Sequence, residues 1–155
     1  PGQRWNPSTH AHPDFDKKGL RNDIAVLQIE KQTNYKSSFP DRMQTNFSDY
    51  ENPCYVMGWG WTKAKGQSSN IFKTAAVQPV KPKKCEEEWR KAYYPRLICT
   101  SNKGNATCRG DSVGPLICEN KLTGVVCFGK PCGTGRPDTF RAVSYYNVWI
   151  DSVIN

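Results

Sequence analysis

The sequence lacks any apolar run near the ~20 residues that a membrane-spanning helix needs, so we expect no membrane partner. It also lacks an initial methionine and an apolar signal core after Pro1, which indicates a processed product, an expressed fragment or an incomplete sequence. Internal repeats are absent as well. With 155 residues, 37% hydrophobic and 23% charged, the composition is that of one folded domain and excludes a collagen, a coiled coil and a strongly disordered chain.

Histidine is scarce, and its positions argue against a metal site. The two histidines, His10 and His12, lie far in sequence from every cysteine, and no Cys-x-x-Cys spacing occurs. Zinc sites usually bring cysteine and histidine together at short spacings. We therefore expect no metal and no cofactor.

Cysteine, by contrast, is abundant, with seven residues. This density is typical of secreted proteins and predicts an extracellular chain with disulfides. Two glycosylation sequons, at residues 46–48 and 105–107, modestly support a secretory route and a glycoprotein. Because seven is odd, one thiol is left over or pairs outside the chain.

Acidic residues are too few to balance the basic ones: 22 Lys and Arg face 14 Asp and Glu, a formal net charge of +8. The densest basic stretch, residues 81–84, is short, and neither a basic helix nor an aromatic–basic alternation is present. These features argue against nucleic acid as a partner. A solvated basic surface is the simpler interpretation, and contact with a polyanion stays open as an alternative.

Local patterns predict a mostly β chain. Residues 1–23 and 31–53 are polar and rich in turn residues, so they are predicted to be loops. Short apolar runs indicate strands at residues 24–29, 54–61, 72–80, 96–99, 115–119, 122–128 and 138–143, with a hairpin turn at 120–121.

Two segments are predicted to be helical. Residues 85–93 place acids at the N-terminal end and bases at the C-terminal end, as the helix dipole favours. Residues 145–155 space their apolar side chains at helical intervals, which predicts a terminal helix.

The clearest chemical signature lies in residues 108–116, Cys-Arg-Gly-Asp-Ser-Val-Gly-Pro-Leu. A serine between glycines in a tight loop can be an exposed nucleophile, here Ser112, and nearby backbone N–H groups can stabilise an oxyanion. Gly-Asp-Ser alone is common in turns, so its meaning depends on matches elsewhere in the chain.

Such matches occur in order along nearly the whole chain, which resembles the chymotrypsin/trypsin-like serine proteases. The matching segments are the triad-aspartate segment at 22–27, the Gly-Trp-Gly strand at 58–60, the nucleophile loop at 108–112, the substrate-lining strand at 125–129 and the terminal helix at 146–150. The resemblance implies an all-β fold, a trypsin-like double antiparallel β-barrel with the second barrel complete, the first barrel partial and a C-terminal helix.

On this resemblance the chain is one partial protease domain. Residues 1–48 would hold the end of the first barrel and the crossover, residues 49–144 the second barrel, and residues 145–155 the C-terminal helix. A missing N-terminal segment or chain would then be a partner of this one.

The resemblance also implies three disulfides. They pair Cys54 with Cys118, Cys85 with Cys99, and Cys108 with Cys132. Cys127 is then left over, at a position where the family usually has serine. The simpler interpretation of Cys127 is a small buried residue on a strand, and a link to a missing segment stays open as the alternative.

Roles in catalysis follow from the same resemblance. Ser112 would be the nucleophile, and the backbone N–H groups of Gly110 and Ser112 would form the oxyanion hole. Asp23 would orient and support the histidine base. In active members of the family the counterpart of Asp111 pairs with the amino terminus freed by activation cleavage, and this pairing shapes the oxyanion hole.

Three features depart from the family. The histidine base in its Ala-His-Cys context and the Ile-Val-Gly-Gly amino terminus are both absent; His12 matches a structural His-Pro, and His10 has no motif around it. Without a base Ser112 keeps an ordinary hydroxyl, so this chain alone is expected to be inactive. The third departure is Val113, where the family has glycine. A β-branched residue would strain the loop or tilt Ser112 if unusual dihedrals are needed there.

Four residues are expected to contribute to substrate binding: Ala106, Cys127, Gly129 and Asp138. Ala106 stands where trypsin-like members carry aspartate, which argues against a simple Lys/Arg pocket. Gly129 leaves the pocket wall open, and Asp138 either lines the pocket with a carboxylate or is an ordinary surface acid. We expect a pocket that is apolar, or broad with some tolerance for basic residues.

Two functions are compatible with these features. The first is a secreted serine endopeptidase that acts on protein or peptide substrates, represented here without the part that carries the catalytic histidine. The alternative is a non-catalytic serine protease homologue that acts as a binding or regulatory module. Val113, Cys127 and the missing histidine favour the alternative.

Overall fold

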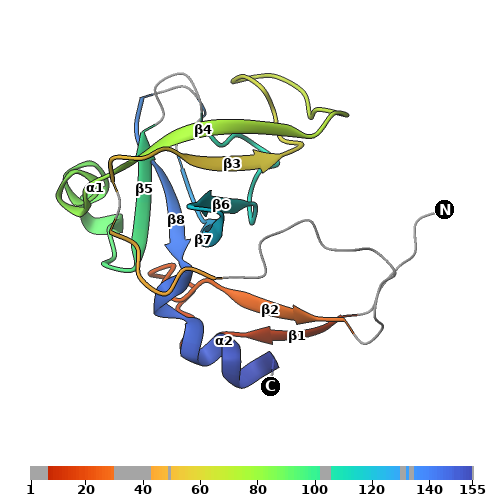
Figure 1. Ribbon diagram of the computed structural model, residues 1–155, viewed down its shortest axis with the longest axis vertical. Helices are drawn as coiled ribbons and strands as arrows, with labels where there is room; N and C mark the ends of the chain where they lie inside the picture. Colours follow the sequence, from red (N-terminus) through yellow and green to blue (C-terminus); the bar gives the residue numbers. More distant parts are fainter. Residues whose placement is uncertain are drawn as a thin grey trace.

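The computed structural model describes residues 7–29, 43–48, 50–101, 106–129, 132 and 135–154, and these contain eight strands and two α-helices (Figure 1). The strands are β1 (Ser8–Ala11), β2 (Ala25–Gln28), β3 (Cys54–Gly58), β4 (Lys73–Val80), β5 (Leu97–Ser101), β6 (Pro115–Cys118), β7 (Lys121–Val126) and β8 (Asp138–Ala142). The helices are α1 (Pro82–Trp89) and α2 (Asn147–Ile154), with two 3₁₀ turns, η1 (Arg90–Ala92) and η2 (Val143–Tyr145). Neither of the described α-helices is both long and apolar enough to cross a membrane.

Six of the strands form a closed antiparallel barrel in the order β3-β4-β5-β8-β7-β6. Strand β3 pairs with β4 on one side and with β6 on the other, which closes the ring. In Figure 1 the barrel occupies the upper part of the molecule, and β1, β2 and α2 lie below it. The predicted all-β class with a complete barrel and a C-terminal helix is confirmed.

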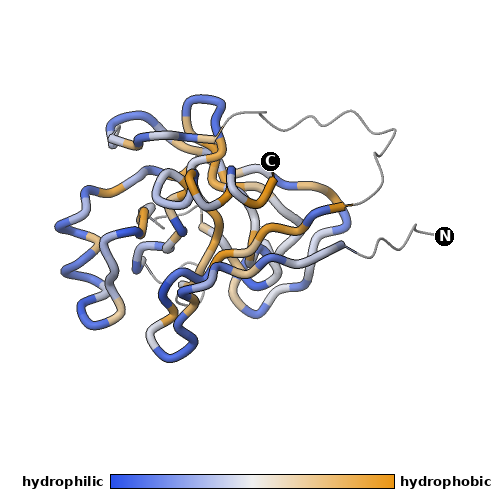
Figure 2. The backbone as a smooth tube through the Cα atoms, turned by 90° about the horizontal axis from the view of Figure 1, so that it is seen from below, coloured by the Kyte–Doolittle hydropathy of each residue, from blue (hydrophilic) through white to orange (hydrophobic). Residues whose placement is uncertain are grey.

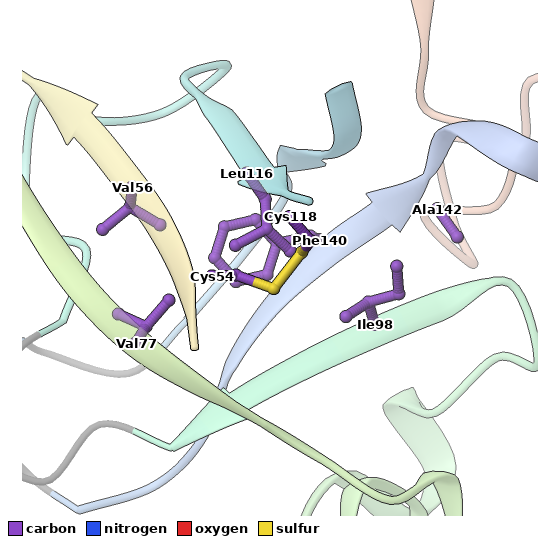
Figure 3. Packing of buried hydrophobic residues seen from close by; sticks show 8 residues of the cluster. All are labelled: Cys54, Val56, Val77, Ile98, Leu116, Cys118, Phe140 and Ala142. Carbon is purple, nitrogen blue, oxygen red and sulfur yellow. A yellow bond between two sulfur atoms is a disulfide. The ribbon is translucent and has the colours of Figure 1, made fainter. Parts of the chain in front are cut away.

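The barrel encloses a small core built around a disulfide (Figure 3). Leu116 and Phe140 are fully buried there, and the Cys54–Cys118 bond lies between them and the facing strands. Figure 2 shows the matching pattern along the chain, with hydrophilic residues in the outer loops and hydrophobic ones toward the middle. The other members of the cluster are Val56, Val77, Ile98 and Ala142.

Strands β1 and β2 form a separate two-stranded antiparallel sheet, with Ser8 opposite Gln28. The prediction that residues 1–23 are loop is therefore wrong for β1. Its sequence, Ser-Thr-His-Ala, carries no apolar alternation, so the strand depends on backbone pairing with β2 rather than on its own side chains. The predicted connection at 31–53 lies largely outside the described residues.

Helix α1 begins three residues earlier than predicted, at Pro82, and ends where Arg90 adopts a φ of +43°. Proline suits the first turn because its missing N–H has no partner there in any case. The shift overturns the predicted dipole match, since the first turn of α1 contains no acid and the last turn no base. Residues 90–92 continue as η1 rather than as α-helix.

The hairpin between β6 and β7 turns one residue earlier than predicted, at Glu119 and Asn120. Both residues have positive φ, +49° and +56°, as a tight two-residue turn with the twist of a hairpin requires. The remaining predicted strands match observed strands to within a few residues at each end.

Candidate active site

Ser112 lies in a loop folded by two successive backbone turns. The Asp111 N–H donates to the Cys108 carbonyl (3.0 Å), and the Gly114 N–H donates to the Asp111 carbonyl (3.0 Å). Gly110 has a φ of +96°, a conformation that favours glycine because it strains any residue with a Cβ. The loop therefore presents an exposed Ser112 at its tip.

The Asp111 carboxylate ties this loop to the end of β3. Its Oδ1 accepts a hydrogen bond from the Gly60 N–H (2.9 Å), and its Oδ2 accepts one from the Cys108 N–H (3.0 Å). A Cβ atom at Gly58 or Gly60 would overlap this carboxylate. Because Gly58 and Gly60 have no Cβ atom, the Asp111 carboxylate can approach their backbone closely.

Two backbone N–H groups beside the serine, those of Gly110 and Ser112, have no acceptor within the described part of the chain. The neighbouring N–H groups of Asp111, Val113 and Gly114 all donate to carbonyl oxygens. Donors without an intramolecular partner are available to a developing oxyanion. The oxyanion-hole role of Gly110 and Ser112 stays a prediction, and this arrangement is compatible with it.

Asp23 is held by its neighbour Asn22, a buried residue with a φ of +49°. The Asn22 Oδ1 accepts hydrogen bonds from Arg96 Nη1 (2.9 Å) and from the Tyr146 hydroxyl (3.3 Å), and its Nδ2 donates to the Asp14 carbonyl (2.9 Å). Burial raises the pKa of Tyr146, although Arg141 and Arg96 act in the opposite direction. The phenol is protonated at neutral pH, as its ordinary pKa already ensures, and it can donate to Asn22.

These positioning residues are absent from the sequence-based prediction. The one available signal was Asn22, because asparagine adopts positive φ more readily than other non-glycine residues. Arg96 belongs to no recognisable motif. Its guanidinium contacts Asn22, which is 74 residues away in sequence, only in the folded chain. Its guanidinium also lies over the rings of Tyr94 and Tyr146, at 5.6 and 5.8 Å.

Two cavities meet at Ser112. The first, which we call the Asp23 cavity, has a volume of about 510 Å³ and is lined by Asp23, Ser112 and Cys127 among mostly apolar side chains. The second, the Gly129 cavity, measures about 590 Å³ and is lined by Ser112, Cys127 and Gly129. The structure therefore brings four of the predicted site residues together.

Ala106 and Asp138 lie elsewhere. Ala106 lines a third cavity of about 220 Å³ beside Asp111, which we call the Asp111 cavity. Asp138 is 1% exposed, so it is not a surface acid; its Oδ2 accepts a hydrogen bond from the Thr107 N–H (2.7 Å). A Cβ atom at Gly129 would lie 3.2 Å from Asp138 Oδ1, so this carboxylate lies directly behind the Gly129 wall.

Neither histidine lines the Asp23 cavity or the Gly129 cavity. His12 packs its ring against Tyr146 (5.5 Å) and Trp149 (4.9 Å), and its Nδ1 accepts a hydrogen bond from the Asp14 N–H. His10 lies on β1, and its Nε2 is buried without a hydrogen-bond partner. Among the described residues, no group of three His, Cys, Asp or Glu side chains is placed to hold a metal ion.

The structure contains the three disulfides implied by the resemblance and one free thiol. The bonds join Cys54 to Cys118, Cys85 to Cys99, and Cys108 to Cys132. Cys127 is free and half-buried, on the segment that follows β7. The Cys108–Cys132 bond lies in the wall of the Gly129 cavity and ties the first residue of the nucleophile loop to Cys132.

Val113 adopts a φ of +67°, so the loop does need the dihedral that a β-branched residue resists. We expect Val113→Gly to raise the free energy of unfolding by about 0.5–1 kcal/mol, because relief of 1–2 kcal/mol of strain exceeds the entropy cost of glycine. Urea unfolding followed by tryptophan fluorescence would measure it. Val148→Gly is the matched control, since this exposed valine lies in α2, where glycine should destabilise. Equal destabilisation by both changes would contradict the strain at Val113.

Arg141 is only 1% exposed, yet its Nε and Nη1 have no hydrogen-bond partner among the described residues. A buried cation with unused donors is costly, so we expect Arg141→Met to stabilise the chain by about 1–2 kcal/mol. Arg96→Met is the control and should destabilise it, because Arg96 donates to Asn22. Thermal and urea unfolding of both variants would measure the two changes in stability. Destabilisation by Arg141→Met would contradict the expectation.

A closed antiparallel barrel with an exposed serine in a Gly-Asp-Ser loop defines the class of protein. The chain belongs to the trypsin family, whose family model, Trypsin, matches residues 3–150. Its fold is similar to that of neuropsin, a serine protease of mouse brain, with a TM-score of 0.90 and 23% identity over 99% of this chain and 73% of that one.

The chain is also similar in sequence to proteins from human and from Aedes aegypti. Human kallikrein-4 is 28% identical over 92% of this chain and 58% of its own length, and trypsin 5G1 of Aedes aegypti is 31% identical over 92% and 56%. Human azurocidin is 31% identical over 99% of this chain and 60% of its own length. The chain thus spans little more than half the length of the relatives that it matches.

Proposed function

We propose that this chain provides the nucleophile, the triad aspartate and the oxyanion hole of a serine endopeptidase that acts on protein or peptide substrates. The observation that carries the proposal is that Ser112 and Asp23 line one cavity from two separate parts of the fold. The free N–H groups of Gly110 and Ser112 support it, because they adjoin the serine where an oxyanion would form.

The base of this site is proposed to come from sequence that precedes residue 1. The Asp23 cavity contains no histidine, and its apolar lining leaves room beside Ser112 for an imidazole. We assign residues 1–48 to the end of a first barrel and the crossover, residues 49–144 to the second barrel and residues 145–155 to the C-terminal helix. The chain alone is proposed to be inactive, since a serine without its base retains little catalysis.

The Asp111 cavity supports a further part of the proposal. In the active enzyme, Asp111 would pair there with an amino terminus freed by cleavage, and the cavity of about 220 Å³ beside its carboxylate has room for such a group. This pairing would add a third partner to Asp111, besides Gly60 and Cys108.

Secretion is proposed from the three disulfides, since such bonds persist in oxidising compartments. The side chain of Asn46, in the first sequon, is exposed and open to glycosylation, whereas Asn105 of the second lies outside the described residues. Contact with a polyanion is proposed for the exposed lysines Lys81, Lys83 and Lys84 at the start of α1.

The experiment that tests the enzyme proposal uses the protein together with the sequence that its own transcript encodes upstream of Pro1. We expect an Ala-His-Cys segment there, labelling of Ser112 by a fluorophosphonate probe and cleavage of peptide substrates. Ser112→Ala should abolish labelling, and the 155-residue chain alone should label little. An intact full-length chain without that histidine and without labelling would refute the proposal.

The Gly129 cavity supports a preference for uncharged side chains at the cleavage site. Among the residues that the structure describes, no carboxylate lines this cavity, and Lys65 and Arg109 in its lining would disfavour a basic side chain. We therefore expect a peptide panel on the full-length enzyme to favour apolar residues, with Asp138→Gly widening the tolerated set. Strict Lys/Arg cleavage unaffected by Asp138→Gly would contradict this preference.

A second function keeps support from Val113. Its φ of +67° places a strained valine directly after the nucleophile, which would suit a non-catalytic homologue that binds without cleaving. If the full-length chain contains the histidine yet labels no faster than Ser112→Ala, the binding or regulatory function replaces the enzyme. Restored labelling in Val113→Gly would then assign the lost activity to this residue.

A further inference from the structure

Cys127 lies in an unusual place for a free thiol. It lines both the Asp23 cavity and the Gly129 cavity, and in each of them it shares the wall with Ser112. The thiol is half-buried and forms no disulfide, whereas the other six cysteines are all bonded. A group attached to this sulfur would therefore extend into space next to the serine.

A second, independent feature lies behind the thiol. Arg141 on β8 is 1% exposed, and its Nη2 donates to the carbonyl of Leu20, three residues before Asp23. Its Nε and Nη1 have no hydrogen-bond partner. Buried guanidinium groups normally have their donors occupied, so these two are available to a negative charge that develops nearby.

Strand pairing places Arg141 and Cys127 on the same face of the sheet. Arg141 lies opposite Val125 on β7, and the Cys127 N–H donates to the carbonyl of Thr139, two residues before Arg141. Burial raises the pKa of Cys127 and the negative charge of Asp23 raises it further, whereas the charge and the N–H groups of Arg141 lower it. Burial prevails, so the thiol is mainly protonated at neutral pH. The thiolate that does form has Arg141 as its counter-ion, and guanidinium neighbours of this kind favour thiolate chemistry.

We propose that Cys127 is a thiol–disulfide exchange site, at which a small disulfide such as oxidised glutathione or cystine attaches in the substrate cleft. The Cys127 thiolate attacks one sulfur of the small disulfide, a new S–S bond forms as the old one breaks, and the departing thiolate takes up the proton that Cys127 released. No further oxidant is needed, because the small disulfide is reduced as Cys127 is oxidised.

The Gly129 cavity has the capacity for the attached group. Its volume is about 590 Å³, and Ser112 shares its wall with Cys127. A glutathionyl or cysteinyl group there would occupy the space that a substrate side chain needs. The adduct would thus switch off substrate access reversibly, a consequence that rests on the proposed function, whereas formation of the adduct does not.

The adduct can be tested on the 155-residue chain itself. We expect incubation of the folded chain with oxidised glutathione to add one glutathionyl group, detected by intact mass spectrometry and located at Cys127 by peptide mapping. Mild reduction should remove it while the three native disulfides stay intact. The Cys127→Ser variant should gain no mass. A folded chain that stays unmodified while the urea-unfolded chain reacts would overturn the proposal.

The role of Arg141 has its own readout, the rate of adduct formation. Arg141→Met should slow the reaction about threefold near neutral pH. A thiol pKa that is higher by about one unit leaves about tenfold less thiolate, and that thiolate is about threefold more nucleophilic. Arg141→Lys keeps a positive charge, so it should slow adduct formation less than Arg141→Met does. Arg136→Met serves as a control for a lost arginine elsewhere and should leave the rate unchanged, because Arg136 pairs with Glu88 and lines neither cavity. Equal rates in Arg141→Met and the unmodified sequence would refute the role of Arg141.

Failure of this inference and failure of the proposed function give different results. In the full-length protein, glutathionylation should suppress fluorophosphonate labelling of Ser112, and reduction should restore it. If the adduct forms but Ser112 never labels even without it, the exchange site stands and the enzyme proposal falls. If Ser112 labels and no adduct forms, the enzyme proposal stands and the exchange site falls.

Discussion

Replacement of both Cys54 and Cys118 by alanine is expected to lower the free energy of unfolding by about 4 kcal/mol. The two cysteines are 64 residues apart in sequence, and a bond that closes a loop of this length removes much entropy from the unfolded chain. Both are almost fully buried within the barrel core, so their loss also leaves space beside Leu116 and Phe140. Urea unfolding followed by tryptophan fluorescence would measure the change.

Two other changes make this prediction specific. Replacement of Cys85 and Cys99, which are 14 residues apart, should cost less, about 3 kcal/mol, because the closed loop is shorter. Cys127→Ala removes a cysteine without removing a bond, so it should change stability far less than either pair. A larger loss from the Cys85 pair than from the Cys54 pair would show that loop closure does not set the order.

Gly60→Ala is expected to damage both stability and the nucleophile loop. A Cβ atom at this position would overlap the Asp111 carboxylate, which must then move away from the Gly60 and Cys108 N–H groups. Hydrogen bonds to a charged group contribute about 1.5–3 kcal/mol each, so we expect the loss of both to lower the free energy of unfolding by about 3–6 kcal/mol in urea unfolding. The displaced loop would also shift the N–H groups beside Ser112.

The second effect of Gly60→Ala should appear in the full-length protein as slower fluorophosphonate labelling of Ser112. Loss of one oxyanion donor typically costs about 100-fold or more in rate, so a drop of this size is expected. Gly135→Ala is the control: a Cβ there meets nothing within 4 Å, and only the strain of its positive φ remains, about 1 kcal/mol. Labelling at the normal rate in Gly60→Ala would show that Asp111 does not position the serine.

The most predictable elements of the fold carry their signal in adjacent residues. Strands β3, β4 and β8 coincide with short apolar runs in the sequence. The loop around Ser112 can be recognised from Gly110 and Gly114, which flank the serine. Less predictable elements depend on distant partners. Strand β1 has a polar sequence, and it forms because it pairs with β2. Helix α1 begins at Pro82 because proline is favoured in the first turn of a helix, whereas the distribution of charged residues predicted a start at residue 85.

The site shows the same division between local and distant causes. Ser112, Asp23 and Gly129 could be selected from short motifs, but the motifs say nothing of which cavity each residue lines. Ala106 was expected in the pocket with Gly129, yet it lines the cavity of Asp111. This placement brings Ala106 to the same cavity as residues of β3 and β4, which are distant from it in sequence.

The family, the all-β class, the exposed serine loop and the lack of a histidine in a recognisable catalytic context could all be predicted from the amino-acid sequence. These features reside in residue types and short spacings, which local backbone preferences and chemistry make readable. The folded chain was needed to show that Arg96 binds Asn22 next to Asp23 and that a buried, partly unpartnered Arg141 shares a sheet face with the free thiol of Cys127. Such contacts join segments that are separate in sequence, and their energies depend on burial and geometry that exist only once the chain has folded.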